Sequence, residues 1–159
     1  MKKISILLVI IWMGIIFYFS NQEATVSTTQ SDKVINFVNV IAKNNKSFKD
    51  ILLKLYQLKG ASFVIRKSAH IFSYFVLSIL SFIMFYTHKG SINLSIKYSF
   101  IISILYAISD EIHQLFIPGR SGMIQDVFID CIGIILGIIL ITVIFKLSIK
   151  NKKKQEINI

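Results

Sequence analysis

Apolar residues gather into four long runs separated by polar segments, and these runs cover residues 4–19, 69–86, 98–117 and 127–147. A helix that crosses the hydrocarbon core of a membrane needs roughly 17–25 predominantly apolar residues. In the third run, the helical spacing of Ile108, Ile112 and Leu115 continues straight through an acidic pair, and Pro118 follows the run. The pattern therefore predicts four transmembrane helices, and it predicts that the third ends at Ile117.

The polar link between the first two runs contains an amphipathic segment, residues 31–59. Its apolar residues recur at helical spacing in two stripes, Val34, Ile35, Phe37, Val38 and Ile41, then Ile51, Leu52, Leu55 and Leu58. We expect two short helices that either lie on the membrane surface or cover the bundle as a lid, with Gly60 ending the second. A basic tail, residues 148–159, follows the last run, and we expect one membrane domain over residues 1–159.

The first run could also be a secretory signal peptide, because Lys2 and Lys3 precede it. No small-residue cleavage site closes it, since Phe17-Tyr18-Phe19-Ser20-Asn21 follows, and we therefore expect a retained helix. The run from residue 4 to residue 19 would reach only about 24 Å, so either the lysines extend to the headgroups or the membrane thins locally.

Composition supports an all-α polytopic membrane protein with four transmembrane helices and an amphipathic helical link, because 54% of the residues are hydrophobic and only 16% are charged. The single cysteine excludes a disulfide framework and a thiolate zinc site. The net charge of +10 comes from residues in links and tails, a distribution that suits anionic lipid headgroups better than nucleic acid. No HExxH-like or cysteine-based ligand spacing is present, so the sequence predicts neither a metal site nor a cofactor. Histidine and carboxylates suit several divalent ions, so a metal-dependent enzyme stays an alternative.

Orientation is less clear from the sequence, because the eighteen Lys and Arg residues divide evenly between the two sides of a four-span bundle. Long links count less under the positive-inside rule. The cations at 66, 67 and 120 would also be neutralised if they lay in a cluster with acidic residues. Both considerations favour cytoplasmic termini, with the long link outside.

Ionisable residues within or beside spans are costly, so they need a partner or a function. They concentrate in three stretches. The first is Arg66-Lys67-Ser68-Ala69-His70-Ile71-Phe72-Ser73-Tyr74, the second runs from Tyr106 through Asp110, Glu111 and Gln114 to Arg120, and the third is Asp126-Val127-Phe128-Ile129-Asp130. Helical spacing places Lys67, His70 and Tyr74 on one face, and Asp126 and Asp130 on another. A histidine in such a place can also be a core residue bonded to a nearby carbonyl.

Gly133 and Gly137 follow the third stretch one turn apart. Small residues at this spacing allow close helix approach. Packing against the helix that carries His70 and dimerisation of two copies both fit the pattern.

The three stretches together resemble the VanZ-like membrane family, over roughly the last two thirds of the chain. The resemblance implies a small multi-span protein of the bacterial cell membrane, and the family's founding member confers low-level resistance to the glycopeptide teicoplanin. Ser73 departs from the family pattern, in which many relatives carry a glutamate before the tyrosine.

The resemblance implies that the recurrent polar residues form the site, namely Arg66, Lys67, His70, Tyr74, Tyr106, Asp110, Glu111, Gln114, Arg120, Asp126 and Asp130. We expect them to converge at the outer ends of spans two to four, with Arg66 and Arg120 pairing with Asp110, Asp126 or Asp130. Three hypotheses follow. The cluster could bind a lipid-linked, cell-wall or glycopeptide ligand. It could instead be an enzyme site, with His70 as acid/base and Asp110, Glu111 and Asp130 assisting. Finally, it could be a structural set of ion pairs.

Overall fold

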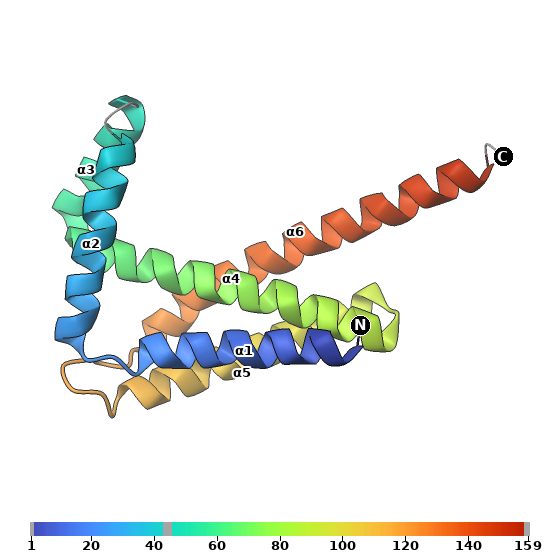
Figure 1. The fold of residues 1–159 in the computed structure, drawn as a ribbon, viewed down its shortest axis with the longest axis horizontal. Helices are drawn as coiled ribbons and strands as arrows, with labels where there is room; N and C mark the ends of the chain where they lie inside the picture. Colours follow the sequence, from blue (N-terminus) through green and yellow to red (C-terminus); the bar gives the residue numbers. More distant parts are fainter. Residues whose placement is uncertain (1, 43–45, 158–159) are drawn as a thin grey trace.

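The computed structural model describes residues 2–42 and 46–157, and its regular secondary structure there is entirely helical (Figure 1). The helices are α1 (Lys2–Ser20), α2 (Ala24–Ala42), α3 (Lys46–Lys59), α4 (Ala61–Lys89), α5 (Ile92–Gln114) and α6 (Ile124–Ile157). Four of them, α1, α4, α5 and α6 as far as Asn151, are long and apolar enough to cross a membrane. The predicted all-α, four-span fold is confirmed. Residues 43–45 of the link and 158–159 of the tail lie outside the described residues.

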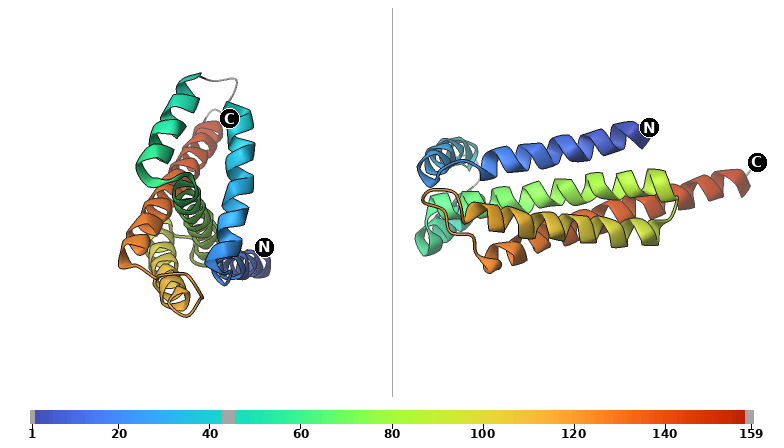
Figure 2. Two further views of the ribbon diagram at one scale, coloured as in Figure 1. Left: turned by 90° about the vertical axis from the view of Figure 1, so that its left-hand side faces the viewer. Right: turned by 90° about the horizontal axis from the view of Figure 1, so that it is seen from below.

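The spanning helices run lengthwise, and α4 is central because it packs against α1, α5 and α6. Helix α6 crosses α4 and extends beyond the bundle, so that both termini lie at the same end of the molecule (Figures 1 and 2). The opposite end carries α2, α3 and the loop after α5. The starts of α4 and α6 and the end of α5 therefore meet at this end, which we call the capped end.

Helices α2 and α3 are the two helices expected in the link, and they stand across the bundle axis at the capped end (Figure 1). Helix α2 begins at Ala24, earlier than the amphipathic pattern indicates. Ser27 and Ser31 are buried, whereas Phe37 and Ile51 are more than half exposed. One polar face of α2 thus covers the bundle while apolar residues of the link stay exposed, as in a helix at a membrane interface.

Local sequence explains the helix boundaries. Gly60 adopts a positive φ of 82° between α3 and α4, a conformation that glycine takes without steric cost.

Helix α1 has 19 residues and reaches about 28 Å, close to the thickness of a hydrocarbon core. Lys2 and Lys3 are the first two residues of this helix, so its apolar part is still residues 4–19. The expectation that the lysines extend to the headgroups or that the membrane thins locally therefore stays a prediction.

Helix α5 ends at Gln114, and the predicted end at Ile117 was wrong by one turn. The N–H groups of Leu115, Phe116 and Ile117 bond to carbonyls three residues earlier, at 3.0–3.2 Å, and the α-helical pattern stops. Pro118 disfavours the helical conformation of Ile117, the residue before it, so the helix does not continue past this point. The shortened helix leaves residues 115–123 as a loop that folds back toward the cluster.

Close approach of α6 to α4 depends on the two glycines. A Cβ at Gly133 would collide with the backbone carbonyl of Ile71, and one at Gly137 would collide with Ser78 Oγ and lie 2.5 Å from the Phe75 carbonyl oxygen. The glycines therefore serve packing within the chain, against the helix that carries His70.

An intramembrane polar cluster and its pocket

A cluster of six buried polar side chains is formed by α4, α5 and α6 at the capped end. They are Tyr74 of α4, Asp110, Glu111 and Gln114 of α5, and Asp126 and Asp130 of α6. Tyr74 and Asp130 are completely inaccessible. Carboxylates inside a membrane bundle are rare and face its interior when they occur, where they pair or serve a function.

His70 joins α4 to α6. Its Nδ1 lies 3.2 Å from Asp130 Oδ1, and the imidazole is 20% exposed whereas the Asp130 side chain is fully buried. The carboxylate fixes the orientation of the ring. The alternative interpretation of His70 as a core histidine bonded to a carbonyl is not what the structure shows.

Glu111 brings α5 into the same cluster. Its Oε2 accepts a hydrogen bond of 3.0 Å from the backbone N–H of Met123, which fastens the 115–123 loop to α5. One potential ligating atom each from His70, Glu111 and Asp130 lies within 4.8 Å of the others. Such a spacing is compatible with a shared cation.

Three buried polar atoms of the cluster have no hydrogen-bond partner within the described part of the chain. They are Glu111 Oε1, Asp130 Oδ2 and the hydroxyl oxygen of Tyr74. A buried polar atom without a partner costs about 1–3 kcal/mol, and a charged one costs more. The cluster therefore has unused binding capacity.

Lys67 forms an ion pair with Asp126, which connects α4 to the first turn of α6. The expected pairing of arginines with Asp110, Asp126 or Asp130 was wrong. Arg120 instead donates from Nε to the Gln22 carbonyl at 2.8 Å and from Nη2 to the Phe19 carbonyl at 3.1 Å. These carbonyls lie at and just beyond the end of α1, where the last carbonyls of a helix lack intrahelical partners.

Arg66 makes no hydrogen bond or ion pair with any other residue that the structure describes, yet it lines the same cavity as Arg120. Burial, and then the nearby charge of Arg66, lower the pKa of Arg120 from its usual range. Arginine stays protonated even so. The two arginines line one cavity together with Asp110, and neither of them forms an ion pair with it.

Asp110, Gln114 and Tyr106 share a face of α5 but have different partners. Gln114 Nε2 donates to Asp110 Oδ2 at 3.3 Å. The Tyr106 hydroxyl donates to the Met13 carbonyl of α1 at 2.6 Å, and its ring lies 6.4 Å from that of Tyr74. Tyr106 consequently ties α5 to α1 and does not line the cavity.

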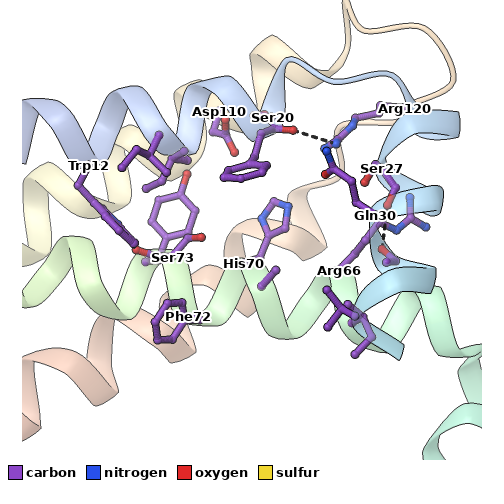
Figure 3. Close-up of a pocket in the computed structure, with 18 residues that line it drawn as sticks. Trp12, Ser20, Ser27, Gln30, Arg66, His70, Phe72, Ser73, Asp110 and Arg120 are labelled. Carbon is purple, nitrogen blue, oxygen red and sulfur yellow. Dashed lines mark hydrogen bonds between the residues drawn. The ribbon is translucent and has the colours of Figure 1, made fainter. Parts of the chain in front are cut away.

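The cavity has a volume of about 330 Å³ and lies between α1, α2, α4 and α5. Figure 3 shows Trp12 and Phe72 at one end and Arg66 and Arg120 at the other, with His70 between them. An apolar end and a cationic end in one cavity suit an amphiphilic molecule with an anionic head.

Several residues of the cavity were not among the predicted site residues, including Trp12 of α1 and Ser27 and Gln30 of α2. Trp12 is the only tryptophan, and its Nε1 donates to the Ser73 carbonyl at 2.9 Å. Ser27 and Ser31, four residues apart, form a polar stripe on α2. That stripe is the sequence signal that could have indicated a buried polar face.

The model of the VanZ/LLP1 family matches residues 5–146, a range that contains most of each of the four spans and every residue of the cluster. The chain belongs to the VanZ/LLP1 family. No curated protein and no solved structure matches it significantly.

In this VanZ/LLP1 chain the structure brings together most of the predicted polar residues. Arg66, His70, Tyr74, Asp110 and Arg120 line the cavity, while Glu111 and Asp130 lie beside it through His70. Lys67 and Asp126 form an ion pair between α4 and α6, and Gln114 donates a hydrogen bond to Asp110. Ser73, the position that departs from the family pattern, also lines the cavity.

Proposed function

We propose that this VanZ/LLP1 protein binds an anionic, lipid-linked component of the bacterial cell envelope in the cavity at its capped end. The observation that carries the proposal is the cavity itself, with apolar walls at Trp12 and Phe72 and the cations Arg66 and Arg120 at the far end. An anionic group between the two guanidinium groups would relieve their mutual repulsion. It would also form charge-assisted hydrogen bonds, which are stronger than neutral ones.

The volume favours partial enclosure of such a molecule. A cavity of about 330 Å³ is at the lower end of the usual range for ligand sites. It can hold a phosphate-sized head and the first part of a chain, while the rest of the chain extends along the apolar surface of α1 into the membrane. A glycopeptide such as teicoplanin is far larger than the cavity and could engage it only through one group.

Binding can be tested with the purified full chain in lipid nanodiscs. The probes are a polyisoprenyl phosphate and the corresponding uncharged polyisoprenol, both measured in the presence of a chelator. We expect saturable binding of the phosphate. We expect Arg66→Ala to weaken it by about tenfold to 100-fold, since hydrogen bonds to charged groups contribute about 1.5–3 kcal/mol. Equal binding of both probes, or no effect of Arg66→Ala, would contradict the proposal.

Lys89→Ala provides a matched control, because Lys89 is an exposed cation at the other end of α4. It removes the same charge from the same helix without touching the cavity. We expect its affinity for polyisoprenyl phosphate to equal that of the unchanged protein.

A second function is favoured by one observation, the contact between His70 and Asp130. A buried carboxylate that orients an imidazole at the edge of a cavity is the usual arrangement of a general acid/base. His70→Gln separates the two functions. Turnover of a lipid-linked substrate that disappears in this variant while binding persists would establish the enzyme, and unchanged biological activity would exclude an acid/base role.

We also propose that the protein acts in a bacterial membrane with cytoplasmic termini, so that the capped end and its cavity face outward. Single cysteines at Ser121 and Lys89, introduced after Cys131→Ser, mark the two sides. We expect a membrane-impermeant maleimide to label position 121 and not position 89 in intact cells. The opposite labelling would place the cavity on the cytoplasmic side.

We also propose that binding in the cavity contributes to glycopeptide resistance in cells. Susceptibility to teicoplanin is compared in cells that express the unchanged protein, Arg66→Ala or Lys89→Ala at equal abundance. We expect only Arg66→Ala to lose any resistance that the protein confers. Equal resistance in cells with Arg66→Ala and in cells with the unchanged protein would contradict a role of Arg66 in resistance.

A further inference from the structure

We infer that His70, Glu111 and Asp130 form a binding site for a divalent transition-metal ion such as Zn²⁺. One potential ligating atom from each residue lies within 4.8 Å of the others. The three residues come from three different spanning helices, α4, α5 and α6. An ion at this point would join all three at the capped end.

The burial of the two carboxylates is the second observation that indicates a ligand. Asp130 is fully buried and Glu111 is 5% exposed, and each has one carboxylate oxygen without a hydrogen-bond partner in the described parts of the chain. Removing a carboxylate from water is costly unless a counter-charge or donors compensate. Asp130 Oδ2 and Glu111 Oε1 therefore need something that the neighbouring side chains do not supply.

The cationic side chains near the two carboxylates have other partners. Lys67 pairs with Asp126, and Arg120 donates to two backbone carbonyls near the end of α1. His70 bonds to one oxygen of Asp130 only. Across the described residues, no lysine or arginine forms an ion pair with Glu111 or Asp130.

The donor set indicates the class of metal. One imidazole nitrogen and two carboxylate oxygens suit a borderline ion such as Zn²⁺, whereas the harder ions Mg²⁺ and Ca²⁺ prefer oxygen ligands alone. With bonds of about 2.1 Å, tetrahedral ligands lie about 3.4 Å apart, so small side-chain rotations of about 1 Å would complete the site. The sequence contains no ligand motif because each helix supplies one residue.

Three protein ligands leave a coordination position open for water or another oxygen donor. His70 also lines the cavity, so the metal site would lie beside the cavity. The metal site itself does not depend on the proposed envelope ligand. It can be tested without any lipid-linked probe.

The test uses the purified full chain in detergent, without a polyhistidine tag and stripped of metal by a chelator. Zn²⁺ is titrated calorimetrically, and Co²⁺ is used in parallel because its visible spectrum reports the coordination geometry. We expect saturation near one Zn²⁺ per chain. Glu111→Gln and Asp130→Asn should each weaken Zn²⁺ binding by more than about 100-fold, which exceeds the usual effect of losing only a supporting residue outside the ligands.

Matched controls are Glu23→Gln and His88→Gln, which change the same residue types outside the cluster. We expect both to bind Zn²⁺ like the unchanged protein. Glu111→Gln decides the outcome even if Asp130→Asn does not fold, because a glutamine oxygen can still accept the Met123 N–H. Absence of saturable Zn²⁺ binding, or equal binding by folded Glu111→Gln, would overturn the inference. Either result would leave the binding of polyisoprenyl phosphate as a separate question.

Discussion

Replacing Gly133 by alanine tests the packing that holds the polar cluster together. The added Cβ would collide with the Ile71 carbonyl oxygen and lie 3.0 Å from the Ile71 carbonyl carbon and 3.1 Å from the Phe75 nitrogen. All three atoms belong to the α4 backbone, so no side chain can move aside. Because favourable contacts between such atoms need about 3.5 Å or more, α6 must move away from α4 by about 1 Å.

That movement reaches the site, because Gly133 lies three residues after Asp130 and Ile71 directly follows His70. A shift of about 1 Å would lengthen the 3.2 Å contact between His70 and Asp130 beyond hydrogen-bond range. Overpacking costs about 1–3 kcal/mol, and losing a hydrogen bond to a charged group costs about 1.5–3 kcal/mol. Alanine has a higher helix propensity than glycine, which offsets about 0.5–1 kcal/mol of this loss. We predict a net loss of about 2–5 kcal/mol in the free energy of unfolding.

Reversible unfolding in mixed micelles, followed by circular dichroism, measures this loss. Gly14→Ala is the matched control, because a Cβ at Gly14 in α1 meets nothing within 4 Å. That variant should be unchanged in stability or more stable by up to about 1 kcal/mol. The reasoning would be refuted if Gly133→Ala were as stable as Gly14→Ala.

Three further changes test individual contacts by the same unfolding measurement. Tyr106→Phe removes the 2.6 Å hydrogen bond to Met13 and should lower the free energy of unfolding by about 0.5–1.5 kcal/mol, whereas no change would mean that α5 is not tied to α1 there. Arg120→Lys cannot donate to both carbonyls near the end of α1 in the same geometry and should destabilise the protein nearly as much as Arg120→Ala, so full rescue by lysine would contradict the bidentate contact. Lys67→Met should cost more than the double change Lys67→Met with Asp126→Leu, because the single change leaves a buried carboxylate unpaired. If the double variant were less stable than Lys67→Met alone, this result would argue against the ion pair between Lys67 and Asp126.

The sequence predicts the spans well because membrane helices are recognised by length and apolarity, which are local properties. The boundaries were harder to place, because they depend on single contacts. Helix α5 stops at Gln114 where three successive N–H groups turn to nearer carbonyls, and the apolar pattern that continues to Ile117 carries no information about this.

For the site, the sequence indicates which residues are unusual but not which partner each one takes. Arg120 is a clear example. Its charge suggests a carboxylate partner, yet the loop after α5 places Arg120 beside the end of α1, where the last carbonyls lack intrahelical partners. Trp12 was missed because an aromatic residue inside an apolar span is indistinguishable from any other lipid-facing or packing residue.

The most direct test of the central claim, that ionisable residues of separate helices meet inside the bundle, is a double-mutant cycle between His70 and Asp130. The unfolding free energies of His70→Ala, Asp130→Ala and the double variant give the interaction energy of the two side chains. We predict a value of about 1 kcal/mol or more, as found for residues in contact, and an additive cycle for His88 with Asp130. Additivity within about 0.5 kcal/mol for His70 and Asp130 would show that the two do not meet, and the proposed cluster would be wrong.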